Sequence, residues 1–375
     1  MRTEFASLLL SLATFGVGFF TRPLGGLLIG AFGDRAGRRP ALMLTIGLMA
    51  VGTLAVAVTP PYAAIGIAAP VILVAARLIQ GLALGGEVGP STAVLLECSP
   101  PGRRGAYTSW QSGSQGIAIL ACGLIGVGLG AMLSKEQLSD WGWRVPFALG
   151  LIIVPVGLYI RRRLPETLLA QGTRRGADVL HFVWQGHRRS LLLAILIIMC
   201  LTITTYVINY LTTYALTSLG LPASKAMLST LTQGALIAGG AFWSGRLSDR
   251  LGRRPVMIWS RIAVVLMVYP AFLFLVGEKT AWALVLVTAL LTVPQLLGAV
   301  AALAAVTEIF PNEVRCSGLA VAYAVSVSVF GGTTQFVTAW LIHATGDPLS
   351  PAYYVIVTSL ISLWAMFQLP ETYKS

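Results

Sequence analysis

The sequence predicts an all-α polytopic membrane protein, and composition is the first reason. Of the 375 residues, 56% are hydrophobic and only 11% are charged, whereas a soluble domain carries about 25% charged residues. Apolar runs long enough to cross a bilayer, which takes about 20 residues, recur along the whole chain. Because backbone polar groups in lipid must be paired within the chain, runs of this length predict helices.

The apolar runs predict eleven helices. Several exceed the length that a bilayer needs, so tilt or extension beyond the hydrocarbon core is expected. The predicted helices cover residues 5–31, 41–58, 67–97, 106–132, 145–160, 190–216, 226–246, 256–276, 282–306, 317–342 and 353–369.

The basic residues indicate how these helices are oriented. Of the 26 Lys and Arg residues, 18 fall in one set of alternate loops, 5 fall in the other, and Arg22, Arg77 and Arg261 lie within helices. Since Lys and Arg concentrate in cytoplasmic loops, the richer side and the C-terminus are expected in the cytoplasm. The net charge of +12 is spread over these loops, which argues against nucleic acid as a partner. With 22 Arg against 4 Lys and many Ala and Gly residues, the composition indicates a GC-rich bacterial genome, so the membrane is expected to be a bacterial cytoplasmic (inner) membrane.

Pairs of motifs recur at nearly one spacing. GAFGDRAGRRP at 30–40 and GRLSDRLGRRP at 245–255 share the pattern G-x-x-x-D-R-x-G-R-R-P at an offset of 215. LPET at 164–167 returns at 369–372, and a Glu-Pro-Arg pattern recurs at an offset of 211. Matched motifs at one spacing indicate two homologous halves, a plan known among transporters.

The repeat divides the chain into an N-terminal half at 1–160, a basic linker at 161–189 and a C-terminal half at 190–375. Two predicted helices precede Asp249 within the second half, but one precedes Asp34 in the first. The repeat therefore predicts one more helix before residue 1. Counting that helix as helix 1 of twelve, the N-terminal half carries helices 2–6 and the C-terminal half carries helices 7–12. Either the start codon is assigned too far downstream or the protein is genuinely truncated.

With eleven of twelve helices, the chain resembles the major facilitator superfamily. RLIQG at 77–81 and the duplicated G-x-x-x-D-R-x-G-R-R loop carry this resemblance. Further segments resemble the metabolite:proton symporter branch, and two of them look closest to citrate or tricarballylate–proton symporters. The branch segments are GGEVG (85–89), PPGRRG (100–105), WGWRVPF (141–147) and PET, and the last two are TSWQSGSQ (108–115) and VTEIFPNEVRCSGLAVAY (306–323).

The resemblance implies a twelve-helix carrier that works by alternating access around a cavity between its halves. The expected function is proton-coupled symport of a small carboxylate, namely citrate, tricarballylate or a related di- or tricarboxylate. One alternative is symport of a zwitterionic osmolyte or a shikimate-like metabolite. Another is a non-transporting or inactive membrane fragment, because helix 1 usually carries the acidic residues tied to proton coupling.

An enzyme is the least favoured class. The sequence carries no phosphate-binding glycine loop, nucleophile elbow or zinc-ligand spacing, so no cofactor or metal is expected and the energy should come from an ion gradient. The expected partners are a small anionic metabolite, a proton and the lipid bilayer, and a monomer is expected.

Arg22 lies inside the first predicted helix, where a fixed charge costs about 2.5–3.5 kcal/mol on insertion scales. It precedes Asp34 by twelve residues, roughly 18 Å along a helix, which places it past mid-membrane. Its planar fork suits a bidentate contact with a carboxylate, so Arg22 is a candidate substrate-binding residue. The alternative is a pair with a buried acid such as Glu87. Pro23 allows a bend beside it.

Polar side chains at helical spacing are further candidates for the substrate cavity. Amides are better candidates than hydroxyls, which can bond back to their own helix. Alternatively, these side chains only join helices through hydrogen bonds worth about 0.6 kcal/mol each. The candidates are Gln111 and Gln115 on helix 5, Tyr206 and Asn209 on helix 7, and Tyr323 on helix 11.

Arg77 and Glu87 on helix 4 are candidates for proton coupling. Arg77, Gln80 and Gly81 share one helix face, and in similar proteins this motif braces helix 4 and assists proton transfer, so both roles stay open. Glu87 is the only acid deep in a predicted helix, and it is either a proton carrier or half of a permanent ion pair. Arg261, one turn into helix 9, is expected to snorkel to the membrane surface.

The two repeated loops are expected to act as latches that hold one face closed, not as binding sites. The resemblance implies that their aspartates pair with basic residues and helix N-termini. The candidate latch residues are Asp34, Arg35, Arg38, Glu97, Arg104, Asp249, Arg250, Arg253, Glu308 and Arg315.

Overall fold

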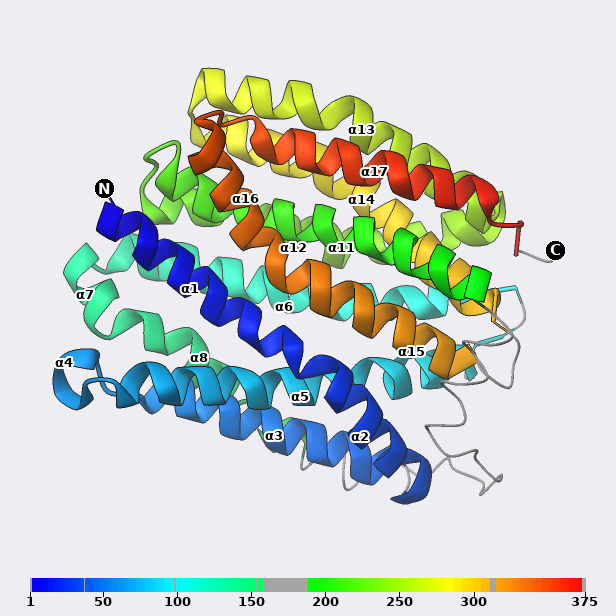
Figure 1. Cartoon of the computed structure of the whole chain (residues 1–375), viewed down its shortest axis with the longest axis horizontal. Helices are drawn as coiled ribbons and strands as arrows, with labels where there is room; N and C mark the ends of the chain where they lie inside the picture. Colours follow the sequence, from blue (N-terminus) through cyan, green and yellow to red (C-terminus); the bar gives the residue numbers. More distant parts are fainter. Residues whose placement is uncertain are drawn as a thin grey trace.

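The computed structural model is a bundle of long helices (Figure 1). Among the residues that it describes there is no strand, and eight helices are long and apolar enough to cross a membrane. The predicted all-α membrane protein is thereby confirmed. The structure describes residues 2–310 and 315–372, except for 37, 98, 101, 153, 158 and 160–187. Only the backbone is described for residues 2–8, 27, 30, 31, 33–36, 38, 39, 88–94, 96, 97, 315–318 and 320.

The chain before residue 160 forms the helices of the lower part of Figure 1. They follow the predicted apolar runs, with short helical pieces added in two loops, except that the helix predicted over 145–160 is interrupted after Gly150. These elements are α1 Arg2–Phe20, α2 Arg22–Ala36, α3 Arg38–Val58, α4 Tyr62–Ile65, α5 Ala68–Glu97, α6 Arg104–Met132, α7 Lys135–Asp140, the 3₁₀ turn η1 Gly142–Arg144 and α8 Val145–Gly150.

The chain after residue 187 forms the helices of the upper part of Figure 1. The first of them begins two residues before its predicted start, inside the expected linker, whose residues up to 187 lie outside the described part. These elements are α11 Arg188–Thr217, α12 Ala223–Leu251, α13 Arg253–Glu278, α14 Ala281–Glu308, α15 Arg315–Ser326, the π-helical turn η2 Val327–Gly331, α16 Gly332–Thr345 and α17 Ser350–Gln368.

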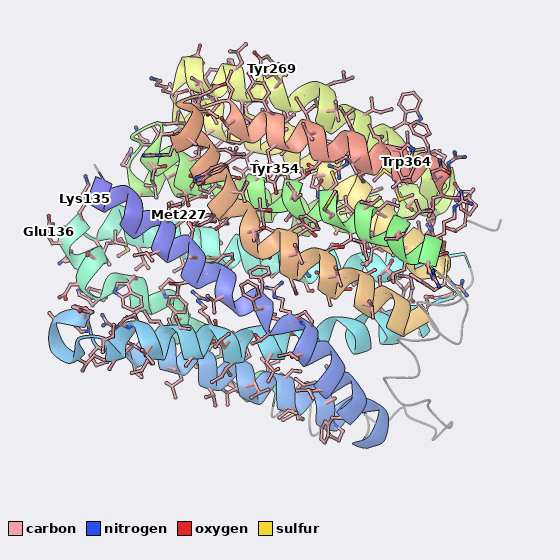
Figure 2. All side chains as sticks on the ribbon, viewed as in Figure 1. Lys135, Glu136, Met227, Tyr269, Tyr354 and Trp364 are labelled. Atoms are coloured by element: carbon pink, nitrogen blue, oxygen red, sulfur yellow. The ribbon has the colours of Figure 1, made fainter. Side chains whose placement is uncertain are left out.

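The long segments run in alternating directions, with α1–α2 and α15–η2–α16 each running as one segment, so the connections alternate between two ends of the bundle. The α2–α3 and α12–α13 junctions, where the repeated motif falls, lie at one end together with the C-terminus (Figure 1). The α11–α12, α13–α14 and α16–α17 connections lie at the other end. Lys135 and Glu136 mark that second end, and Trp364 lies near the first (Figure 2). The two motif copies therefore share one end, as the charge distribution predicts.

The first predicted helix is broken, and the expectation of one continuous helix over 5–31 is wrong. The break falls at Thr21, between α1 and α2. Pro23 causes it, because its ring nitrogen has no hydrogen to donate to the carbonyl one turn earlier. The Thr21 hydroxyl donates to the carbonyl oxygen of Leu78 on α5 (2.7 Å), so the break is tied to the neighbouring helix.

Glycines bring α1 and α2 into backbone contact with α5. A Cβ atom at Gly18 would stand 2.8 Å from the carbonyl oxygen of Arg77, and one at Gly85 would overlap the backbone of Arg22. Small residues allow membrane helices to approach this closely. The contact fixes where α2 begins and therefore where the Arg22 side chain leaves the backbone.

The two groups of helices meet along α6 and α12, which lie side by side (Figure 1). A Cβ at Gly105 would stand 2.7 Å from the carbonyl oxygen of Gly245, and one at Gly123 would stand 2.6 Å from the Cα of Leu231. The contact therefore runs from one end of these helices to the other. A second contact joins α1 to α16 at Gly16, where a Cβ would stand 2.6 Å from the carbonyl oxygen of the facing helix.

The helix after the predicted linker, α11, is the central element of the second group. In its most apolar stretch 72% of the residues are buried, against 11% for α6. It packs against α14, α15 and α17. Beside it, the predicted helix over 317–342 is divided by η2, and a Cβ at Gly331 would stand 3.0 Å from ring atoms of both Phe19 and Tyr206. π-helical turns occur frequently at functional sites.

Candidate functional site

Arg22 opens α2 and reaches toward the second group of helices. Its guanidinium carbon lies 3.7 Å from the centre of the Phe19 ring. The guanidinium interacts with the hydroxyl of Tyr206 on α11 and lies within electrostatic reach of Tyr323 on α15. Its Nε atom is buried and has no hydrogen-bond partner among the described residues. A permanent cation therefore lies where α2, α11 and α15 meet.

Three aromatic rings cluster next to this cation, which lies over the ring of Phe19. The ring centres of Phe15 and Phe19 are 5.4 Å apart, those of Phe19 and Tyr206 are 5.5 Å apart, and those of Phe15 and Tyr206 are 6.4 Å apart. The electron-rich face of an aromatic ring attracts a cation, by up to about 2 kcal/mol when the pair is desolvated. The Phe19 ring thus contacts the guanidinium without neutralising its charge, and Phe15 and Tyr206 pack against that ring.

Glu87 lies away from Arg22, although both side chains are described. No ion pair within 4.0 Å joins them. Gly85 faces α2, and residues two positions apart lie on opposite sides of a helix. Glu87 instead shares a face with Gln80, seven residues earlier, which contacts Thr53 on α3. The Arg22–Glu87 pair that the sequence left open is absent here, and Glu87 is exposed on the α3 side of α5.

Arg77 belongs to a network that joins α5 to its neighbours. Its Nη1 donates to Oε1 of Gln80 (3.0 Å), and Nε2 of Gln80 donates to the hydroxyl of Thr53 on α3 (3.2 Å). The Arg77 guanidinium also lies 5.9 Å from the ring centre of Phe147, just before the end of α8. This geometry is that of a brace between α3, α5 and α8.

The polar candidates fall into two groups. On α11, Asn209 follows Tyr206 by three residues and lies on the same face, so the structure brings Arg22, Tyr206 and Tyr323 together with Asn209 one turn away. The two glutamines of α6 lie on the side of that helix turned away from α12. Of these, Gln111 is half-buried and Gln115 is exposed.

Asp249 joins the two groups of helices at the end that carries the repeated motif. Its Oδ1 and Oδ2 accept hydrogen bonds from the backbone N–H groups of Gly105 and Ala106, each at 2.9 Å. These donors belong to the first turn of α6, where the helix dipole favours a negative charge. Arg253 donates to the same carboxylate at 2.8 Å, and its side chain is 2% exposed. The carboxylate thus bridges α12, α13 and α6.

Glu371 also belongs to this cluster, although the sequence prediction does not include it, whereas Glu308 is a predicted latch residue. Glu371 accepts hydrogen bonds from the backbone N–H groups of Arg253 and Arg254, each at 3.0 Å, and so caps α13. Glu308 lies 3.6 Å from the Arg253 guanidinium and accepts a bond from Thr372 (2.6 Å). The returning LPET motif was the signal that could have identified this cap.

The remaining latch candidates fall outside the cluster or outside the described side chains. Arg104 and Arg250 are exposed, and neither forms an ion pair with a described residue. The structure therefore leaves both outside the latch. The side chains of five others are not described: Asp34, Arg35, Arg38, Glu97 and Arg315.

Arg261 does not snorkel to the membrane surface, and that prediction is wrong. Its side chain is 1% exposed and donates to Thr204 on α11 (2.9 Å) and to Gln295 on α14 (3.0 Å). Buried side-chain partners thus replace the headgroups that a snorkelling arginine would reach.

The helical bundle, with membrane-length elements throughout, defines a multi-pass membrane protein. The family model described as Major Facilitator Superfamily matches residues 2–325 and 222–375. The chain belongs to the major facilitator superfamily, a family of membrane transporters.

Curated relatives include transporters of more than one kind. The Citrate-proton symporter of Klebsiella pneumoniae is 38% identical over 373 residues, which cover 97% of this chain and 82% of that protein. The Citrate-proton symporter of Salmonella typhi is 36% identical, covering 97% and 84%. The Proline/betaine transporter of Salmonella typhimurium is 33% identical, covering 96% and 75%.

Solved structures agree on the fold. The xylose transporter XylE from E. coli, in a partially occluded inward-open conformation, superposes with a TM-score of 0.76. The sequences are 18% identical, and the match covers 99% of this chain and 90% of that chain. At this identity the likeness speaks for the fold alone, and it confirms the predicted major facilitator fold.

Proposed function

We propose that the protein is a secondary carrier that moves a small carboxylate together with a proton by alternating access. Citrate, tricarballylate or a related di- or tricarboxylate is the proposed substrate. The observation that carries the proposal is the Arg22 guanidinium, a permanent cation that lies over the Phe19 ring and interacts with Tyr206 of the other group of helices. The two citrate–proton symporter relatives support the same substrate class.

The chemistry of the Arg22 site suits an anion. Arg22 is half-buried and has no anionic partner among the described residues. A bound carboxylate would offset the cost of its partial desolvation through charge-assisted hydrogen bonds. Stacking on Phe19 leaves the edge of the guanidinium free of the ring, and Nε has no described partner. The hydroxyl of Tyr206 interacts with Arg22, and Tyr323 lies within its electrostatic reach, so both are proposed as further donors to the substrate. Gln111, Gln115 and Asn209 are proposed to line the route.

The proposed transport cycle uses the two halves that the repeat predicts. The halves at 1–160 and 190–375 would rock about the bound substrate, with 161–189 as the linker. Release of Asp249 from the first turn of α6 would open the end at which the motif copies lie. By the distribution of basic residues, we propose that this end faces the cytoplasm of a bacterium and that the carrier works as a monomer.

Proton coupling is proposed to involve Glu87 and Arg77, which lie ten residues apart on α5. Glu87 is the one acid placed deep in a predicted helix. It lies on the α3 side of α5, apart from Arg22, so substrate and proton would occupy different faces of the N-terminal half. The Arg77–Gln80–Thr53 network would then hold α3 against α5 while Glu87 exchanges its proton.

A zwitterionic substrate is the second candidate. The proline/betaine transporter relatives favour it, and so does the cluster of Phe15, Phe19 and Tyr206, because aromatic rings bind quaternary ammonium groups. In this structure the Arg22 guanidinium occupies the face of Phe19 that such a group would need. The carboxylate is therefore the preferred proposal.

Reconstitution in proteoliposomes tests the proposal. Uptake of radiolabelled citrate, driven by an imposed pH gradient, should be inhibited by tricarballylate and not by glycine betaine. Arg22→Gln should reduce citrate uptake at least tenfold while the protein still inserts, because the carboxylate loses its bidentate cation. Arg246→Gln is the matched control, because it removes an exposed arginine that contacts Phe242 on its own helix. Citrate uptake that survives in Arg22→Gln would remove Arg22 from the site.

A further inference from the structure

Arg261 is a guanidinium sealed inside the second group of helices. Its side chain is 1% exposed. Nη1 donates to the hydroxyl of Thr204 (2.9 Å) and Nη2 donates to Oε1 of Gln295 (3.0 Å). Its Nε atom is buried without a hydrogen-bond partner among the described residues.

Every partner of Arg261 in the described part of the chain is neutral. The described ion pairs join Arg253 to Asp249 and to Glu308, and none includes Arg261. A buried charge is ordinarily paired with an opposite charge, because dipoles alone offset its desolvation incompletely. The interior of the second group therefore holds an uncompensated positive charge.

Hydrogen bonds connect this charge to the interior face of α11. Nε2 of Gln295 donates to the carbonyl oxygen of Leu201 (2.8 Å) and to the hydroxyl of Thr205 (2.9 Å), which is half-buried. Tyr206, the next residue, interacts with Arg22. Thr204 and Tyr206, two positions apart, lie on opposite sides of the helix. One helix thus separates the two cations.

The repeat supplies an independent indication that the hydrogen bond between Arg261 and Gln295 is not accidental. Gln80 and Gln295 are related by the offset of 215 that relates the two motif copies. Each accepts a hydrogen bond of 3.0 Å from an arginine, Gln80 from Arg77 and Gln295 from Arg261. Arg77 comes from the same helix as its glutamine and is half-buried, whereas Arg261 comes from a neighbouring helix and is sealed. The second half therefore keeps an arginine–glutamine pair, but its arginine is buried too deeply to contact a ligand directly.

We propose that Arg261 sets the charge selectivity of the carrier without touching the substrate. The inference rests on the proposed carboxylate function and deepens it. Two guanidinium groups on either side of α11 would raise the electrostatic potential where the substrate binds, so that affinity grows with the negative charge of the ligand. Across about one helix diameter, at an effective dielectric constant of about 20, one such cation changes affinity roughly tenfold per unit of ligand charge.

Binding measurements on the purified full chain test this role. Dissociation constants for tricarballylate, with three carboxylates, and for glutarate, with two, are measured for the wild type, Arg261→Gln and Arg261→Lys. The loss in Arg261→Gln should be about tenfold larger for tricarballylate than for glutarate, whereas Arg261→Lys should keep most of the preference. A purely structural role would weaken both ligands by the same factor, and that result would overturn the inference.

Two further variants keep the test decisive if Arg261→Gln does not fold. Gln295→Glu places a carboxylate against the guanidinium and cancels its charge at nearly constant shape, so it should reproduce the loss of preference. Thr204→Val, the matched control, removes a neutral partner and should leave the preference unchanged. Failure of the wild type to bind either carboxylate would overturn the proposed function and this inference together. Wild-type binding with an unchanged preference in both Arg261→Gln and Gln295→Glu would overturn the inference alone.

Discussion

Arg22 and Arg261 are both interior guanidinium groups, but their surroundings give them different proposed roles. Arg22 lies over the Phe19 ring, interacts with the hydroxyl of Tyr206 and lies within electrostatic reach of Tyr323, and both tyrosines come from other helices. Arg261 is held by Thr204 and Gln295 within one group of helices. The first can meet a ligand directly, whereas the second can act only through its electric field.

Glu87 provides the first prediction at the scale of a residue. If Glu87 carries the coupled proton, Glu87→Gln removes the titrating group while keeping the shape of the side chain. Uptake driven by an imposed pH gradient should then fall to the level without a gradient, and citrate counterflow should persist. Both rates are measured in proteoliposomes. Citrate accumulation by Glu87→Gln that still depends on external pH would show that a residue other than Glu87 carries the coupled proton.

Sequence position indicated how deep each charged residue lies, but not which way it points. Arg22 and Arg261 were both recognised as intramembrane cations, since depth follows from the distance along a helix. The direction of a side chain depends on how its helix is rotated against its neighbours, which hydropathy does not specify. For that reason the sequence does not decide whether Arg22 pairs with Glu87, and it does not reveal that Arg261 is buried. Pro23 did signal the bend beside Arg22.

At the scale of elements, the contact between α2 and α5 should control the position of Arg22. In Gly85→Ala the added methyl would overlap the Arg22 backbone and force the two helices apart. A small misplacement of a binding group is costly, so citrate affinity should fall about tenfold or more. The matched control is Gly47→Ala on α3, because a Cβ there meets no atom within 4 Å. Equal affinities in the two variants would show that the close contact does not position Arg22.

The Asp249 latch is also a property of elements, since it joins α12 and α13 to α6. Asp249→Asn removes the charge that Arg253 and the first turn of α6 share. Breaking a buried pair in this way costs about 3–5 kcal/mol, so the thermal midpoint of the protein in detergent should fall. Arg250→Gln, one residue away and exposed, should leave it unchanged. A midpoint that is the same in both variants would contradict a role in holding this end closed.

For the whole molecule, the distribution of basic residues predicts a single orientation. With the four native cysteines replaced, Lys135→Cys should react with a membrane-impermeant maleimide in intact cells. Arg250→Cys should react only in inverted vesicles. The opposite labelling pattern would reverse the proposed orientation and, with it, the side to which the latch belongs.

The architecture was predictable to a greater extent than the site. Long apolar runs and the repeated motifs predict the order and direction of the helices, and the predicted order and direction agree with the structure. The interruptions at Thr21 and at η2 depend on local backbone chemistry and on contacts with other helices. The Glu371 cap joins two segments more than a hundred residues apart. The repeated LPET motif marks Glu371 as a residue of interest, but its partner on α13 cannot be read from the sequence.

The glycine-lined contact between α6 and α12 also bears on how the molecule can move. Where large side chains interlock, turning one helix against another requires them to disengage. Here backbone lies against backbone at Gly105 and Gly123, so the two surfaces are smooth. Such a contact offers little steric resistance to rotation of α12 against α6, and the hydrogen bonds of Asp249 to α6 would restrain that rotation at one end.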